Sequence, residues 1–208
     1  MRTFTLLLFC CLTATAFGQD STQTLKSRYY SDEIAVGVFD KTLSDSLEYA
    51  NKLHPAQLYT ICGSFYRDSM LNEAAVVYLI ARNRYRLYNK TNPNYEASAD
   101  GALAGSFSSI FGSVVTPHLQ ENLENFAHVL KFSGTWYKEN KYFYFDYPEN
   151  DSLYQLQTDA MLELSDTLLN HPEEYIQQLE NKRKEREELM KKYEEELDDE
   201  FEDMPSED

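Results

Sequence analysis

The chain has 208 residues, with 35 acidic and 19 basic side chains, and therefore a formal net charge of −16 at pH 7. Such an acidic protein repels nucleic acid phosphates and anionic lipid headgroups, so we expect neither DNA nor RNA as a partner. Gly and Pro are sparse, with 7 and 6 residues, beside 16 Tyr and 12 Phe. This composition favours an all-α fold.

Residues 1–18 predict a secretory signal peptide. Arg2 precedes a compact apolar run at 6–12, and small residues follow up to Ala16 and Gly18. The run is shorter than the roughly 20 apolar residues that span a bilayer. We therefore expect cleavage after Ala16 or Gly18, no transmembrane segment in the mature chain, and an exported protein that is periplasmic or secreted.

Cys62 is the only cysteine outside the predicted signal peptide, which excludes an intramolecular disulfide in the mature chain. No protease signature surrounds it. Its position on a helical apolar face indicates a small core residue rather than a nucleophile.

Residues 19–31 are polar and without periodicity, which predicts a flexible arm. Residues 32–171 predict one helical domain, with its clearest helices at 56–66 and 71–88. These two helices have apolar faces formed by Leu58, Ile61, Cys62 and Phe65, and by Ala74, Tyr78, Ala81 and Tyr85.

Weaker periodic patterns predict four more helices in this domain. They cover 45–53, capped by Ser44, and 100–111, 119–132 and 151–169. Thr116-Pro117 is expected to break the chain between the second and the third. The inward stripe predicted for the last is Leu153, Leu156, Ala160, Leu164 and Leu168.

Residues 172–197 predict a charged helix that Pro172 opens and that projects into solvent beyond its first turns. Glu180 and Lys184, and two further pairs, have the stabilising order at positions i and i+4. Residues 194–208 contain ten acids and no base. We expect residues 198–208 to form a disordered acidic tail.

The helix pair at 55–88 resembles a single tetratricopeptide or Sel1-like repeat. The positions that carry this resemblance are Leu58, Ile61-Cys62 and Phe65 on the first helix, and Ala74, Tyr78 and Ala81 on the second. This chain departs from the family pattern at three positions. The family has tryptophan at the position of Leu58, glycine at that of Cys62 and proline at that of Arg86. No second copy follows. The resemblance implies a helical array that binds proteins through a concave face.

An aromatic stretch at 133–147 is the most unusual part of the chain, and we expect it to be an irregular loop. Exposed aromatic side chains stack on sugars or anchor protein partners. The candidate interaction surface consists of Trp136, Tyr137, Tyr142, Tyr144 and Tyr147. The alternative is a loop that packs across helix ends.

The sequence assigns no catalytic residue, no cofactor and no metal. His118, Glu121, Asn125 and His128 share one helix face, but they span about 15 Å, which is too long for one ion. No glycine-rich phosphate-binding fingerprint occurs.

These patterns together predict an exported helical protein that acts as an interaction or scaffolding module in the bacterial envelope, with an unknown protein partner. One alternative is a carbohydrate- or envelope-binding protein that uses 133–147. Another is a hydrolase with two converging carboxylates, one of them with a raised pKa.

Overall fold

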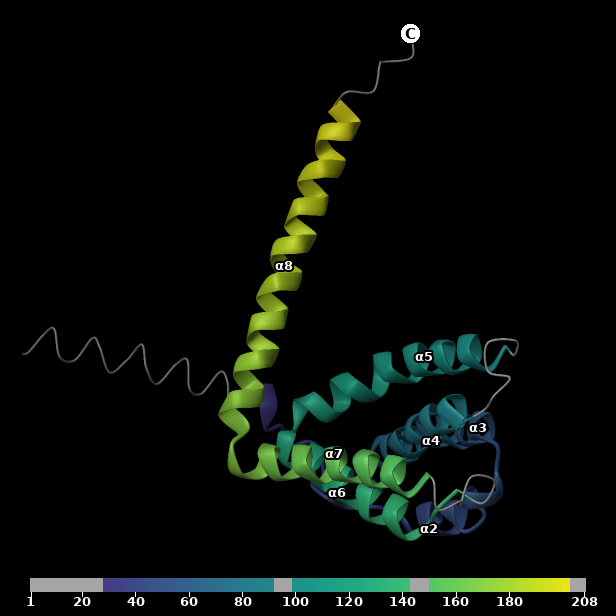
Figure 1. Ribbon diagram of the computed structural model, residues 1–208. Helices are drawn as coiled ribbons and strands as arrows, with labels where there is room; N and C mark the ends of the chain where they lie inside the picture. The colour runs from purple at the N-terminus through teal and green to yellow at the C-terminus, as the bar shows by residue number, and fades with distance from the viewer. Residues whose placement is uncertain (1–27, 92–98, 143–149, 203–208) are drawn as a thin grey trace, which may run out of the picture. The chain divides into compact units, whose positions relative to one another are not determined.

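The computed structural model describes residues 28–91, 99–142 and 150–202, with side chains to residue 194. Every named element in these ranges is helical, which confirms the all-α prediction (Figure 1). The elements are α2 (Lys41–Leu47), the 3-10 helix η1 (Ala50–Lys52), α3 (Pro55–Arg67), α4 (Leu71–Thr91), α5 (Asp100–Glu121), α6 (Leu123–Glu139), α7 (Asp151–Asn170) and α8 (Pro172–Glu202).

The chain divides into two compact units, residues 1–169 and 170–208. The first is an irregular bundle of α2 to α7. The predicted signal peptide, 1–18, lies outside the described residues. Within the described ranges, no helix has both the length and the apolar character needed to cross a membrane.

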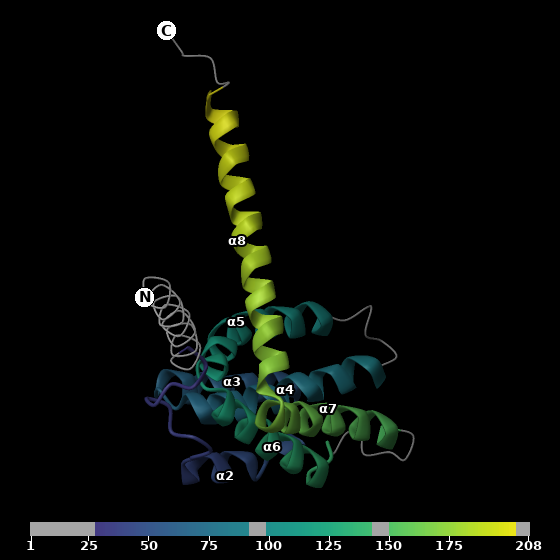
Figure 2. The same cartoon turned by 90° about the vertical axis from the view of Figure 1, so that its left-hand side faces the viewer.

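Helix α4 forms the centre of the first unit, since 13 of its 21 residues are buried. Helices α3, α5 and α6 pack against it, and Figures 1 and 2 show α4 between α5 on one side and α6 on the other. The predicted pair at 56–66 and 71–88 is confirmed as α3 and α4. All the predicted inward residues are buried except Ile61, which is half-buried.

Both ends of α3 have a specific local cause. His54 caps α3 by accepting a hydrogen bond from the backbone N–H of Ala56, and Pro55 occupies the first helical position. At the other end Ser69 adopts φ 61°, a left-handed conformation that reverses the chain toward α4.

The predicted break at Thr116-Pro117 is wrong, because α5 continues through Pro117 to Glu121. Val115 and Leu119, on either side of the proline, are both buried, and this packing offsets the lost backbone hydrogen bond. The chain turns instead at Asn122, which has an extended backbone and caps α6 through its side chain.

The prediction of an irregular loop at 133–147 is wrong for its first part, because α6 runs to Glu139. Gly134 lies where α7 crosses closely. A Cβ atom at Gly134 would lie 3.1 Å from Leu162 Cδ2 and 3.3 Å from Met161 Cβ.

Helix α7 is confirmed, but its buried face differs from the predicted stripe. Leu156 is 65% exposed. The buried residues are Tyr154, Thr158, Met161, Ser165 and Leu168. Ser165, a polar member of this face, is satisfied internally, because its hydroxyl donates to the carbonyl of Ala127 at 2.8 Å.

The first helix of the domain also starts earlier than predicted. The carboxylate of Asp40, rather than Ser44, caps α2 by accepting from the backbone N–H of Thr42. The end of the predicted arm packs into the unit, since Tyr29 is buried and the N–H of Ser31 donates to the carbonyl of Glu121. Residues 19–27 lie outside the described residues.

In the second unit, α8 begins at Pro172 as predicted and extends to Glu202, past the predicted end at 197. Arg183 pairs with Glu180 at 2.7 Å and with Glu187 at 3.8 Å. Residues 203–208 of the predicted tail lie outside the described residues.

An aromatic pocket on helix α6

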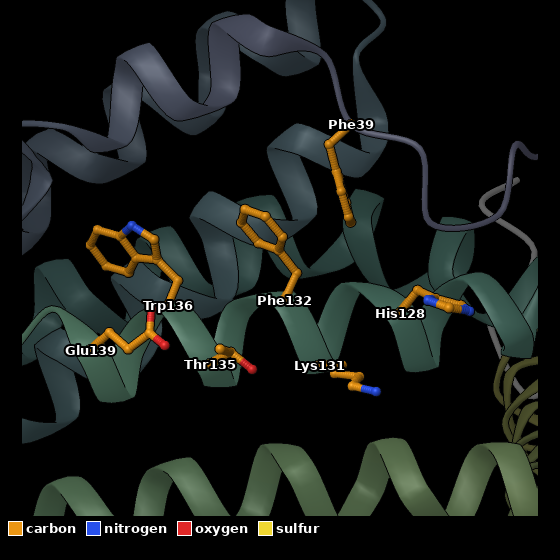
Figure 3. Close-up of a pocket in the computed structure, with 7 residues that line it drawn as sticks. All are labelled: Phe39, His128, Lys131, Phe132, Thr135, Trp136 and Glu139. Atoms are coloured by element: carbon orange, nitrogen blue, oxygen red, sulfur yellow. The ribbon is translucent and has the colours of Figure 1, made fainter.

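A pocket of about 360 Å³ opens on the outer face of α6 (Figure 3). Six of its seven lining residues lie on α6 at helical spacings of three and four, so they share one face. Three half-buried aromatic side chains and four exposed polar ones line it. The lining residues are Phe39, Phe132 and Trp136, and His128, Lys131, Thr135 and Glu139.

The aromatic side of the pocket combines two parts of the chain. Phe132 and Trp136 are one helical turn apart on α6, and Phe39 comes from the segment before α2. The rings of Phe39 and Phe132 pack with their centroids 4.8 Å apart. Figure 3 shows the three rings along one edge and Lys131, Thr135 and Glu139 in a row along the other.

Arg84 supports Trp136 from the core. Its guanidinium carbon lies 4.9 Å from the centre of the Trp136 ring and 5.3 Å from that of Tyr142, which are cation–π distances. The side chain is fully buried, and in the described part of the chain no carboxylate pairs with it. Burial lowers the pKa of Arg84 to about 10, so it remains protonated at neutral pH.

Backbone carbonyls take the place of a counterion for Arg84. The guanidinium donates to the carbonyls of Ala50 and, at 3.1 Å, of Asn140. Asn140 caps the carboxyl end of α6, where the helix dipole favours a cation. The amide of Asn140 donates back to the carbonyl of Trp136 at 2.9 Å. The guanidinium of Arg84 therefore lies behind the ring of Trp136, and Asn140 bonds the backbone carbonyl of Trp136.

The segment that carries Phe39, which we call the strap (residues 31–40), is held by two asparagines. The amide of Asn72 donates to the carbonyls of Ala35 at 3.1 Å and Val38 at 3.3 Å. The N–H of Gly37 donates to Asn125 Oδ1 at 3.1 Å, and Asn125 donates to Asn72 Oδ1 at 2.8 Å. The backbone just before Phe39 is thus fixed to α4 and α6.

Two further contacts hold the strap against the helices. The N–H of Asp40 donates to the buried carboxylate of Glu73 at 2.6 Å. Gly37 has φ +63°, and a Cβ atom there would lie 3.0 Å from the imidazole of His128. Glycine at position 37 therefore permits both the positive φ and the close approach of the backbone to His128.

The predicted interaction residues differ in where the structure places them. Trp136 lines the pocket. Tyr137 and Tyr142 are 0% and 1% exposed, so they are core residues and not contact residues. Tyr144 and Tyr147 lie outside the described residues.

Sequence reasoning missed Phe39, Phe132 and the polar row. The signal for Phe132 and Trp136 was their spacing of four residues, which becomes informative only if the segment is helical. Phe39 has no such signal, because it is brought to the pocket by the strap.

The structure also describes the surroundings of the cysteine and histidine side chains that the sequence analysis considered. Burial raises the pKa of the Cys62 thiol to about 12, and the thiol donates to the carbonyl of Ala74 at 3.3 Å, which suits a core residue. His118 Nε2 bonds Asn72 Oδ1 at 2.9 Å, while His128 lines the pocket. Among the residues that the structure describes, no three His, Cys, Asp or Glu side chains are grouped so as to hold a metal ion.

Comparison of the chain with family models, with curated proteins and with solved structures gives no match.

Proposed function

We propose that this protein is an exported interaction module that binds another protein through the aromatic pocket on α6. The observation that carries the proposal is the pocket itself, in which three half-buried rings lie beside a row of exposed polar groups. Binding hot spots have this composition, with buried aromatic anchors inside a polar rim. The signal-peptide pattern at 1–18 supports export.

The support behind Trp136 favours binding as well. Arg84 packs against the ring from the core side, so little side-chain freedom is lost when a partner covers the ring. Such preorganisation increases affinity because ordering costs are reduced.

The test is affinity capture from native envelope extract, followed by titration of the purified partner. Thr135→Tyr fills the pocket from an exposed position and leaves Trp136 and Arg84 in place. We expect it to weaken partner binding at least about ten-fold, as expected for loss of a hot spot.

Tyr49→Ala is the matched control, because Tyr49 is 60% exposed and does not line the pocket. It should bind as the unmodified protein does. Equal binding by both variants would place the contact elsewhere on the molecule.

A second candidate function is glycan binding. The face of a tryptophan beside hydrogen-bonding groups such as Thr135 and Glu139 also suits a sugar ring. Because Trp136 is the only tryptophan in the chain, its fluorescence reports occupancy directly. Saturable quenching by envelope oligosaccharides, lost in Thr135→Tyr, would favour this function.

The hydrolase alternative finds less support. Acidic catalysis needs two carboxylates that converge. The described lining of the pocket contributes one, from Glu139.

A further inference from the structure

The polar edge of the pocket carries opposite charges at its two ends. Lys131, Thr135 and Glu139 follow each other at intervals of four residues on α6 (Figure 3). Eight residues of helix separate Lys131 from Glu139, a rise of about 12 Å. Both side chains are exposed, and neither forms an ion pair or a hydrogen bond with another residue that the structure describes.

We propose that the pocket recognises an extended peptide segment of the partner in which an aromatic residue lies between an acidic and a basic residue. This inference rests on the proposed function and specifies its ligand. The aromatic side chain would pack on Phe132 and Trp136. The acidic residue would face Lys131, and the basic residue would face Glu139.

The distance along α6 between Lys131 and Glu139 determines the expected spacing between the acidic and the basic residue of the peptide. An extended chain rises about 3.3 Å per residue. A distance of about 12 Å therefore corresponds to an acidic and a basic residue three to four positions apart. At a spacing of four, the residue midway between them projects to the same side of the extended chain and can enter the aromatic part of the pocket.

The charge of the whole molecule supports a mixed segment over an acidic one. With a net charge of −16, the protein repels a purely acidic peptide at long range. His128, beside Lys131 in the pocket lining, adds a hydrogen-bond donor at the end that would hold the acid. A purely basic peptide would place a cation against Lys131.

The experiment titrates the full mature chain with capped pentapeptides and follows Trp136 fluorescence. The probes are Glu-Ser-Phe-Ser-Lys, its all-acidic and all-basic counterparts with Glu or Lys at both ends, and a version with Ala in place of Phe. We expect the mixed peptide to bind about two- to five-fold more tightly than either counterpart, the range for exposed ion pairs. The Ala version should bind at least about ten-fold more weakly than the mixed peptide.

Charge reversal gives the sharper result. Lys131→Glu should make the basic peptide the tightest of the three, and Glu139→Lys should do the same for the acidic peptide. Combining both substitutions should restore the preference for the mixed peptide. Lys138→Glu is the control, since Lys138 is exposed on α6 but does not line the pocket, and it should leave the order unchanged.

Three outcomes would overturn the inference: the same peptide order in all variants, equal binding of the Ala version, or no binding of any peptide at millimolar concentration. If Thr135→Tyr still abolishes partner binding in these cases, the proposed function stands and only the ligand assignment fails. Quenching by oligosaccharides but by none of the peptides would assign the pocket to sugars.

Discussion

At the scale of single residues, Arg84 is a large, fully buried and charged side chain in the described part of the chain. It donates to the carbonyls of Ala50 and Asn140 and stacks on two aromatic rings, although no carboxylate in the described chain neutralises it. Buried cations without a paired anion are costly, and they persist where several acceptors surround them.

Replacing Arg84 tests how much this arrangement stabilises the fold. Arg84→Ala removes both donors, leaves two carbonyls unsatisfied and opens a cavity, so we expect the free energy of unfolding to fall by about 3 kcal/mol. Urea unfolding monitored by circular dichroism gives this value. Arg82→Ala, from the same helix but only half-buried, is the control and should cost less. Equal losses in both variants would contradict a special role for Arg84.

Cys62 gives the protein a specific sensitivity to alkali. Burial raises its pKa from 9.0 to about 12. The unfolded thiol therefore ionises first, so the contribution to stability is complete below about pH 9 and is lost as pH rises toward 12. The expected loss is about 1.4 kcal/mol at pH 10.

Urea unfolding at pH 8 and pH 10 measures this loss. Tyr59, whose pKa burial also raises to about 12, adds to the effect, so Cys62→Ala should remove only the cysteine part. An identical pH dependence in Cys62→Ala would contradict the assignment.

At the scale of elements, the position of the strap determines whether Phe39 lines the pocket. Asn72→Ala removes two hydrogen bonds to the strap and one acceptor for Asn125. We expect faster hydrogen exchange at residues 35–40 and a loss of about 2 kcal/mol in unfolding free energy. Asn181→Ala, on α8, is the control and should leave exchange in the strap unchanged. Unaltered exchange in Asn72→Ala would show that Glu73 and Gly37 suffice to hold it.

The elements that sequence predicts well are those whose apolar residues follow one helical face. This holds for α3 and α4, where Ala74, Tyr78, Ala81 and Tyr85 are buried as predicted. The boundary between α5 and α6 could not be predicted, because burial of Val115 and Leu119 overrides the effect of Pro117. The pocket could not be predicted either, since Phe39 and Phe132 are 93 residues apart in sequence.

At the scale of the whole molecule, the division into two units predicts independence of the first. The buried core of the described residues ends at Leu168, and α8 contributes no buried residue to it among its described side chains. A chain ended after His171 should therefore unfold cooperatively with a free energy within about 1 kcal/mol of the full chain. Its Trp136 emission should be unchanged. A large loss of stability would contradict this independence.

The predicted signal peptide bears on which partners the proposed binding pocket could meet, because it predicts that the protein is exported. Export would present the α6 pocket to envelope or extracellular proteins. We expect the mature chain to begin at Phe17 or Gln19, as N-terminal sequencing or intact mass would show. Leu8→Arg interrupts the apolar run and should retain uncleaved precursor in the cells, because a charge in the h-region opposes insertion.

Thr22→Arg, in the segment after the predicted cleavage site, is the matched control for that experiment and should be exported normally. Precursor of full length in both variants and in the unmodified protein would contradict export. It would also move the search for the partner to the cytoplasm. The buried Cys62 would be compatible with either compartment, because burial of the thiol protects it from oxidation as well as from disulfide exchange. The measured N-terminus of the chain, rather than the redox state of Cys62, therefore tests whether the protein is exported.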